Sequence, residues 1–178
     1  MFENSGLTEL IYYADRIPNE CFKNCANLTS VKIENNLVYV GSMAFYSCTN
    51  LTSVLFSENA GSEFIYKQAF AECYNLEKLT LPNSSTYYEY EAFKNCKALS
   101  IVLFQVNSYI SANDGSIFTG CKNLTTFEVD ENHQEYKFNN NLLTSKDDKV
   151  IYLAPYGYNF GEYTIDECYE TIAEGAFS

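Results

Sequence analysis

The hydrophobic residues of this chain recur in one fixed order along most of its length. Five phenylalanines are separated by 23, 25, 23 and 25 residues, and each is followed by a cysteine three residues on and a leucine six residues on. The segment "AFYSCTNLTSVLF", residues 44–56, therefore matches "AFAECYNLEKLTL", residues 69–81, position for position. The aligned phenylalanines are Phe22, Phe45, Phe70, Phe93 and Phe118. Such a period indicates a protein built from stacked structural repeats.

Each unit also carries two apolar residues nine and eleven positions after its phenylalanine. In two successive units these are Val31 with Ile33 and Val54 with Phe56. Alternation with a period of two predicts a short β-strand that buries one face. The slot before the phenylalanine holds Cys21, Ala44, Ala69, Ala92 or Ile117. Small residues are expected in this slot because successive turns of the chain crowd each other there.

A single unit contains too few apolar side chains to fold alone. Four or five large side chains, at roughly 1.5 to 3 kcal/mol each for full burial, only match the entropic cost of ordering the backbone. Stacked neighbours supply the missing apolar surface, so we expect one solenoid domain over residues 1–178, with about six to seven coils. The N-terminal "MFENSGLTELIYY" fits as a degenerate unit that retains Phe2, Leu7, Leu10 and Tyr12.

The C-terminal part is less regular than the rest. Phe118 and the next candidate for its slot, Phe177, are 59 residues apart. Between them, the apolar runs 142–144 and 150–153 flank the polar "SKDDK", which predicts a β-hairpin within an insertion over residues 133–160. The segment "YTIDECYETIAEGAF" then resumes the repeat, with Ile165 as an expected strand residue and Ala176 and Phe177 in the small and aromatic slots.

The charge balance narrows the choice of partners. The formal net charge is -12 at pH 7, which repels phosphate backbones and anionic lipid surfaces. We therefore expect no nucleic acid partner. No run of apolar residues approaches the length of a membrane span, and "MFENSGLTEL" lacks the features of a secretory signal. We therefore expect no direct membrane insertion of the chain. The chain opens and stops within repeats, and we expect it to be a piece of a longer protein.

Five of the seven cysteines occupy the same repeat slot, which favours a column of buried free thiols over a disulfide framework. They are Cys25, Cys48, Cys73, Cys96 and Cys121. Neighbours in such a column come within bridging range, but five residues cannot all pair. Cys21 and Cys25 are four residues apart, yet no second pair of zinc ligands is visible. The single histidine, His133, lies in the polar "DENHQEY" and is expected in solvent.

Four Asn-X-Ser/Thr sequences match the N-glycosylation pattern, at Asn27, Asn50, Asn83 and Asn123. Three of them occupy one repeat slot, where asparagine suits a turn, so Asn83 is the favoured acceptor in a eukaryotic secretory pathway. The sequence contains no phosphate-binding loop, nucleophile elbow or histidine-rich metal motif. We therefore predict no catalytic, cofactor-binding or metal-binding residues and no enzyme activity.

The repeat resembles that of BspA-type, or treponemal-type, leucine-rich repeat proteins, whose units have the form "I…AFxxCxxLxxVxLP". One unit carries the resemblance in Ile65, Ala69, Phe70, Cys73, Leu76, Leu79, Leu81 and Pro82. The resemblance implies a leucine-rich-repeat solenoid of stacked coils, each with a short parallel β-strand, with an irregular convex side and an inserted β-hairpin near the C-terminal end. Proteins of this family occur in host-associated bacteria and in protist parasites, often on the cell surface, where they are linked to adhesion.

Strand residues that alternate with the buried ones must face outward and line up across the coils into one sheet surface. Most are polar, but several are apolar, and exposed apolar residues in a row can mark a binding patch. The apolar ones are Ile11, Tyr13, Leu55, Ile101 and Leu103. We predict a protein-binding face with Tyr13, Leu55, Ile101 and Leu103 as anchors and Lys32 and Lys78 as polar contacts. Strands favour such residues whatever they bind, so a purely structural origin is the competing interpretation.

The sequence and the resemblance together predict a non-enzymatic protein-binding module, the ectodomain of a cell-surface adhesin that binds host or microbial proteins. The alternative is an intracellular structural or scaffold protein in the cytoplasm that docks into a larger assembly through the same face or through its coil ends. Free thiols favour the alternative, whereas bridged cysteines or attached glycans favour the surface.

Overall fold

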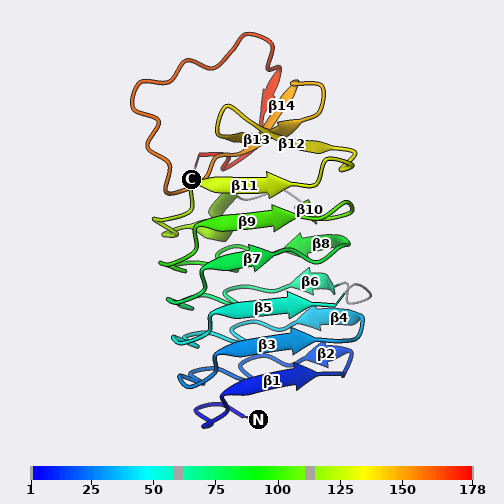
Figure 1. Ribbon diagram of the computed structural model, residues 1–178, viewed down its shortest axis with the longest axis vertical. Coiled ribbons are helices and arrows are strands. Elements are labelled where there is room, and N and C mark those ends of the chain that lie inside the picture. The colour runs from blue at the N-terminus through cyan, green and yellow to red at the C-terminus, as the bar shows by residue number, and fades with distance from the viewer. Residues whose placement is uncertain (1, 58–61, 111–114, 178) are drawn as a thin grey trace.

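The computed structural model describes residues 2–57, 62–110 and 115–177. The chain winds into an elongated stack of coils with the N-terminus at one end (Figure 1), which confirms the predicted leucine-rich-repeat solenoid. Each regular coil contributes one strand to the front of Figure 1 and one strand behind it. The buried phenylalanines, cysteines and leucines of the repeat lie between these two layers in one continuous core.

The strand predicted in each unit forms the front sheet of the stack. Its strands are β1 (Glu9–Tyr12), β3 (Ser30–Ile33), β5 (Ser53–Phe56), β7 (Lys78–Thr80), β9 (Ile101–Phe104) and β11 (Thr126–Val129). The order is β1-β3-β5 and β11-β9-β7, all parallel, and β5 lies beside β7. Equivalent residues of successive coils lie side by side in the sheet, as Val31 and Val54 do, so buried and outward positions form straight rows.

A second parallel sheet, the back sheet, lies on the opposite side of the core and corrects the expectation of an irregular convex side. It runs in the order β10-β8-β6-β4-β2. The strands are β2 (Arg16–Ile17), β4 (Leu37–Val40), β6 (Ser62–Ile65), β8 (Ser85–Tyr88) and β10 (Tyr109–Ile110). The back strands of successive coils are joined by backbone hydrogen bonds. These bonds satisfy N–H and C=O groups that would be solvated by water in an irregular connection.

The predicted phenylalanine and cysteine columns are both present. Successive rings from Phe2 to Phe118 stack with centroids 5.0 to 5.6 Å apart and interplanar angles of 4° to 20°. The thiols of Cys48 and Cys73 each donate a hydrogen bond to the carbonyl of the column phenylalanine in the preceding coil, at 3.2 and 3.3 Å. All seven cysteines lie in the described part of the chain and carry free thiols, as the sequence predicts for the column.

The turns around each column phenylalanine have left-handed backbone, which the sequence analysis did not predict. Two residues after the ring, this conformation occurs at Asn24, Ser47, Glu72, Asn95 and Gly120. Two residues before it, φ is positive at Glu20, Met43, Gln68 and Glu91. Non-glycine residues pay about 1–2 kcal/mol for this backbone region. At six of these positions the conformation is held by a backbone N–H that donates to a carbonyl of the next coil, as Ser47 N does to Ala71 O at 2.9 Å.

The Asn-Leu-Thr sequences have a structural role in the stack. The hydroxyl of Thr29 donates to the carbonyl of Thr8 at 2.8 Å, and the hydroxyl of Thr52 donates to the carbonyl of Thr29 at 3.0 Å. The threonine of the repeat slot therefore links adjacent coils. Asn83, the favoured acceptor from the sequence, is half-buried, and its side-chain oxygen accepts a hydrogen bond from the Asn107 backbone at 3.0 Å.

A small terminal sheet ends the stack. It consists of β12 (Tyr136–Asn139), β13 (Leu142–Ser145), β14 (Val150–Leu153) and β15 (Thr171–Ile172). The predicted hairpin is confirmed, because β13 pairs antiparallel with β14 around the polar turn. β12, which was not predicted, pairs antiparallel with β13. Tyr136 joins the terminal sheet to the stack, since its ring packs against Phe104 and Tyr109 and its hydroxyl donates to the Ile110 carbonyl at 3.2 Å.

His133 is buried, so the expectation of a solvent-exposed loop residue is wrong. Its ring is 5% exposed and stacks on Tyr136 with centroids 4.8 Å apart. The backbone N–H groups of Glu135 and Tyr136 donate to its Nδ1 at 3.2 and 3.0 Å, so Nε2 carries the proton and donates to the Ser108 carbonyl at 2.8 Å. The histidine thereby joins the last regular coil to the start of the terminal sheet.

The prediction that the repeat resumes near the C-terminus is only partly correct. Ala176 is buried, as its slot predicts. Ile165 is exposed and outside any strand, because the strand of this segment is Thr171–Ile172, paired with β14. Phe177 is 49% exposed and packs edge-on to Phe160 at 6.0 Å instead of extending the phenylalanine column. The terminal sheet stands where the next regular coil would have to be.

Helical structure is almost absent from the described residues. The assigned helix is a 3-10 turn, η1 (Gly115–Phe118), which carries the last ring of the phenylalanine column. In residues 2–57, 62–110 and 115–177, no helix has the length and apolar character needed to cross a membrane.

Candidate functional site

The outward side of the front sheet, the front face, carries all six predicted partner-binding residues. In its first three coils, Ile11 and Leu55 are Cα partners of Lys32 from either side, so the three residues form one row. Ile11 is 57% and Leu55 52% exposed. Tyr13, which directly follows β1, is 64% exposed. This open part of the front face presents apolar side chains on a paired, parallel sheet.

The upper part of the front face is partly covered. Ile101 and Leu103 lie on β9 and are only half-buried rather than fully exposed. Lys78 on β7 and Glu128 on β11 form an ion pair of 3.6 Å that crosses β9. Because Lys78 is the strand partner of Ile101 and Glu128 that of Leu103, the ion pair passes over both apolar residues. A partner would have to displace this pair to reach them.

The two predicted polar contacts are both engaged within the chain. Lys32 pairs with Glu34 at 2.5 Å, and the hydrogen bond to that carboxylate raises the pKa of Lys32. Lys78 pairs with Glu128, as described above. Such exposed ion pairs are worth little, so both ammonium groups remain available for exchange with a partner's carboxylate.

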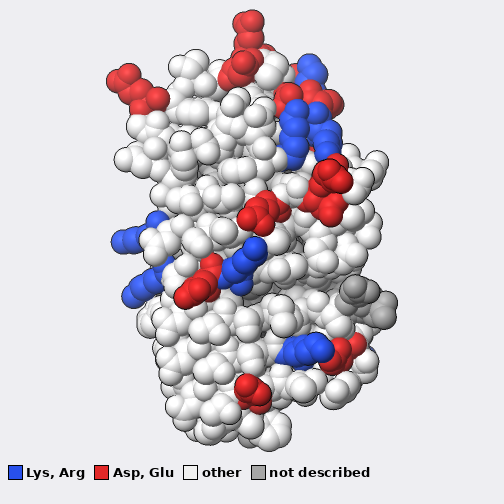
Figure 2. All heavy atoms as spheres, viewed as in Figure 1, with Lys and Arg blue, Asp and Glu red and all other residues white. Residues whose placement is uncertain are grey.

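Charged side chains are sparse over the front face. Figure 2 shows separated charges on the middle coils and a denser group of both signs over the terminal sheet. Ion pairs in that upper region join Lys137 to Asp148 at 2.6 Å and Lys149 to Glu170 at 2.5 Å. A front face with few charges is suited to apolar contacts, because few ions have to be desolvated on binding.

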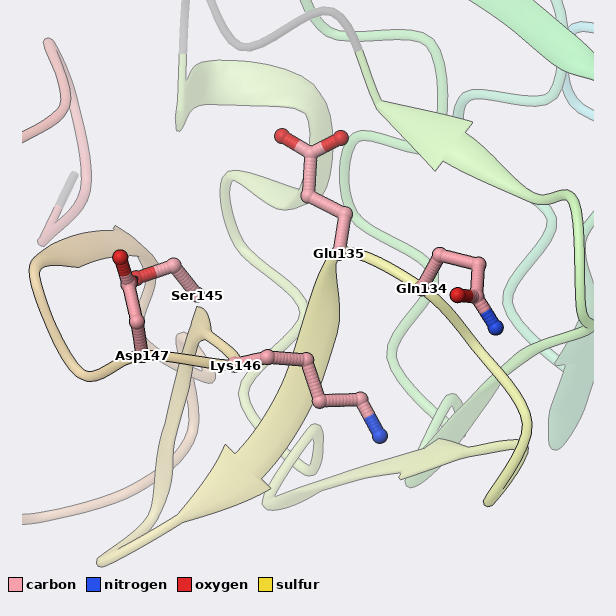
Figure 3. A pocket seen from close by; sticks show the side chains of 5 residues that line it. All are labelled: Gln134, Glu135, Ser145, Lys146 and Asp147. Atoms are coloured by element: carbon pink, nitrogen blue, oxygen red, sulfur yellow. The ribbon is translucent and has the colours of Figure 1, made fainter.

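A hollow beside the terminal hairpin does not form a binding site of its own. It has a volume of about 480 Å³ and is lined by Gln134, Glu135, Ser145, Lys146 and Asp147. Figure 3 shows these side chains pointing in different directions from two segments. Glu135 accepts a hydrogen bond from the Tyr152 hydroxyl at 2.8 Å, and Asp147 accepts one from Ser145 at 2.7 Å. Its carboxylates are therefore committed to local bonds.

Among the residues that the structure describes, no group of three or more histidine, cysteine, aspartate or glutamate side chains is arranged to hold a metal ion. The column thiols are buried, and burial raises the pKa of Cys48 to about 12 and that of Cys73 well above its ordinary value. A thiol that stays protonated is a poor nucleophile and a poor metal ligand. The chemistry of the core is therefore that of packing.

A second row of exposed side chains, on the back sheet, was missed by the sequence analysis. Tyr39, Phe64 and Tyr87 are successive Cα partners on β4, β6 and β8. Each lies six residues before a column phenylalanine, while the residues one position later, Val40, Ile65 and Tyr88, are buried. That constant offset is the signal that would have predicted a second strand and its outward row.

Two parallel sheets of stacked coils around a column of phenylalanines and thiols define a leucine-rich-repeat solenoid with exposed sheet faces. The model of the BspA type leucine rich repeat region matches residues 15–145 in 6 copies. The chain belongs to this family, as the resemblance of its repeat implied. Among curated proteins, no match to the chain is found.

Solved structures of bacterial repeat proteins are similar to the chain. A leucine rich cell surface protein from Faecalibacterium prausnitzii has a TM-score of 0.59 and 26% identity over 67% of this chain and 31% of its own length. A leucine-rich repeat protein from Bacteroides ovatus has a TM-score of 0.58 and 29% identity over 71% of this chain and 32% of its own.

A leucine-rich repeat protein from Eubacterium ventriosum shares the fold over 97% of this chain, with a TM-score of 0.66 and 20% identity. The chain covers 45% of that protein's length. It therefore spans less than half of each of these three relatives.

Proposed function

We propose that this chain is a non-enzymatic protein-binding module of a cell-surface adhesin, which binds a host or microbial protein through its front face. The observation that carries the proposal is the open row of Ile11, Lys32 and Leu55, in which two apolar side chains more than half exposed stand on a regular parallel sheet. Exposed apolar residues on a rigid surface are typical of contact sites, because little entropy is lost when a partner covers them.

Tyr13 lies beside this row, directly after β1, and supplies a ring with a polar tip, a side chain favoured in the centre of interfaces. Ile101 and Leu103 extend the surface towards the terminal sheet once a partner exchanges its own charges with Lys78 and Glu128. In this proposal Leu55 and Tyr13 are the main anchors, and the upper residues contribute less.

Surface localisation is supported by the Faecalibacterium prausnitzii relative, which is described as a leucine rich cell surface protein. Family membership supports the binding role, since stacked repeats of this class offer extended sheet faces. The function of the longer parent protein is part of the same proposal, because the chain spans only a third of that relative.

The binding proposal is tested with the double variant Leu55→Asp, Leu103→Asp. Beads carrying the wild-type chain or the variant are incubated with biotin-labelled surface proteins of epithelial cells and of bacterial cells, and bound biotin is measured. The control is Asn27→Asp, Asn123→Asp, which adds the same two charges at exposed turn positions. We expect at least tenfold less capture by the first variant and wild-type capture by the control. Equal capture by all three chains, with unchanged circular dichroism, overturns the front-face proposal.

An intracellular scaffold is the second candidate, and the seven free thiols favour it. Six of the thiols are buried, however, so they would survive in an oxidising compartment as well. Cys168, which is exposed, reports the compartment better. Antibody staining of intact cells that express the full-length product, with permeabilised cells as the reference, separates the two candidates. Staining only after permeabilisation supports the scaffold and removes the adhesin.

A further inference from the structure

The back sheet carries an aromatic row, defined as Tyr39, Phe64 and Tyr87 together with the adjacent Tyr66. Phe64 is 36% and Tyr87 40% exposed, and Tyr39 and Tyr66 are partly exposed. Strand neighbours of these residues, such as Ile65, point into the core with no exposed surface. The aromatic row therefore faces away from the core, on the side of the stack opposite the front face.

The rings of the aromatic row hold one another in place. Tyr66 stacks on Phe64 with centroids 5.8 Å apart and an interplanar angle of 7°, and it meets Tyr39 edge-on at 5.6 Å. Phe64 meets Tyr87 edge-on at 6.0 Å. Because the side chains are already ordered by these contacts and by the sheet beneath, a partner that covers them loses less conformational entropy than one that binds separate flexible residues.

The chemistry around the aromatic row favours a cationic partner. Ring faces carry negative potential and attract ammonium and guanidinium groups. Two tyrosines outside the aromatic row show this attraction within the chain: the Lys67 ammonium lies 4.8 Å from the ring centroid of Tyr90, and the Lys97 ammonium lies 4.2 Å from that of Tyr74. Two tyrosine rings of this chain outside the aromatic row thus already hold a lysine ammonium over their faces.

Long-range electrostatics act in the same direction. The formal net charge of -12 concentrates cations near the surface and repels anionic partners. Glu89, two residues after Tyr87, is half-exposed at the edge of the aromatic row. The row is continued on β2 by Arg16, the strand partner of Tyr39, and the adjacent Asp15 carboxylate lies 3.9 Å from the Arg16 guanidinium and offsets its charge.

We propose that the aromatic row is a second interaction surface, which binds an arginine- or lysine-rich segment of a partner protein by stacking its cationic side chains on the rings of Tyr39, Phe64 and Tyr87. Arginine fits best, because its planar guanidinium stacks flat on an aromatic face. The inference does not depend on the front-face proposal, since the two surfaces lie on opposite sheets. A chain with both surfaces holds two partners at once.

The test uses a fluorescein-labelled twelve-residue peptide of alternating arginine and glycine, titrated with the whole chain and followed by fluorescence anisotropy. The variant is Phe64→Leu, Tyr87→Leu, which removes two rings but keeps both apolar side chains and the net charge. We expect it to bind the peptide about 5–30-fold more weakly than the wild-type chain, because two cation–π contacts are lost. The matched control is Tyr156→Leu, which removes a 40% exposed ring outside both surfaces and should bind as the wild type does.

Two further peptides complete the test. Replacing arginine by citrulline, which has the same shape without the charge, should abolish binding, and replacing it by glutamate should do the same. Equal affinity of the wild-type and ring-less chains for the arginine peptide would mean that net charge alone attracts it, and the proposal fails. Tighter ring-dependent binding of the citrulline peptide, of a proline-rich peptide or of an uncharged oligosaccharide also overturns it in favour of that occupant. The single variant Tyr87→Leu repeats the measurement if the double variant unfolds.

Discussion

The regular stack and the terminal sheet meet the same requirements by different means. In the stack, each interaction is made once per coil: a ring on a ring, a thiol on a carbonyl, a strand on a strand. In the terminal sheet, single side chains do the equivalent work, with His133 and Tyr136 linking it to the last coil. Each interaction of the stack has copies in the neighbouring coils, whereas the junction depends on a few residues with no copies.

The turns of the two regions show the same contrast. In the terminal sheet, left-handed backbone occurs at Asn140, Asn141 and Asp148, residue types that tolerate it. In the stack, it occurs at Met43 and Gln68, which have no such preference. Local preference therefore accounts for the terminal turns, whereas a stack position such as Met43 needs a backbone bond to the next coil, Met43 N to Lys67 O at 3.0 Å.

Alkaline pH should open the stack and gives the largest expected effect. Burial raises the pKa of Cys48 from 9.0 to about 12, and burial raises those of Cys73 and Cys96 as well. A thiol whose pKa is raised by folding stabilises the fold at pH values below its pKa in the unfolded chain. This contribution is lost as the pH rises towards its pKa in the folded chain. Cys48 alone should cost about 2 kcal/mol of unfolding free energy by pH 10.5, and Cys73 and Cys96 add to this loss in the same direction.

The measurement is urea unfolding in reducing buffer from pH 7 to pH 10.5, and Cys73→Ala should make the pH-dependent loss smaller. Burial also raises the pKa of Tyr136 at the junction, but an unfolded tyrosine ionises only near pH 10, so the onset near pH 9 reports the thiols. A free energy of unfolding that stays level between pH 7 and pH 10 contradicts this account.

Removing one ring from the column should be the next largest effect. Phe70 is fully buried between Phe45 and Phe93, with centroids 5.0 and 5.3 Å away. We expect Phe70→Ala to lower the unfolding free energy by about 3–5 kcal/mol. Phe177→Ala, in the equivalent sequence slot but 49% exposed, should cost much less. Denaturant unfolding compares the two, and similar losses would show that Phe177 belongs to the column after all.

The junction should fail locally when His133 is replaced. His133→Ala leaves the backbone N–H groups of Glu135 and Tyr136 and the Ser108 carbonyl without their partner. We expect a loss of about 2–4 kcal/mol, seen as faster amide hydrogen exchange in β12 while β3 and β5 keep their protection. The exposed neighbour variant Gln134→Ala should leave exchange unchanged. Uniformly faster exchange along the whole chain would mean that the junction and the stack unfold as one unit.

Turn substitutions should give the smallest effects, with opposite signs at two serines of one coil. Ser47 has φ of 58°, so Ser47→Gly relieves strain and should stabilise the chain by about 1 kcal/mol. Ser53 lies in β5, so Ser53→Gly should destabilise it by about 1 kcal/mol. Thermal unfolding of both variants is the check. Destabilisation by Ser47→Gly would mean that the bonds between coils do not force the left-handed turn.

The repeat made much of the fold predictable. The slots of Phe45, Cys48 and Leu51 predicted buried columns, and all three residues have no exposed surface. The front strands followed from alternation, and the outward positions of Leu55 and Lys32 followed with them. The back sheet was not predicted, although Tyr39 precedes Phe45 by the same six residues as Phe64 precedes Phe70. Outward aromatic residues hid the alternation, because they are as apolar as the buried residues beside them.

The sequence by itself determined the period, the core slots and one strand per coil, because the narrow core requires a side chain of similar size in the same slot of every coil. Tertiary structure alone decided the left-handed turns, the burial of His133 and the position of Phe177 outside the column. Each of these depends on a partner in another segment: a carbonyl of the next coil, the Ser108 carbonyl, or the terminal sheet that closes the stack. Hydrogen bonds between distant segments leave no period in the sequence, whereas packing within each coil does.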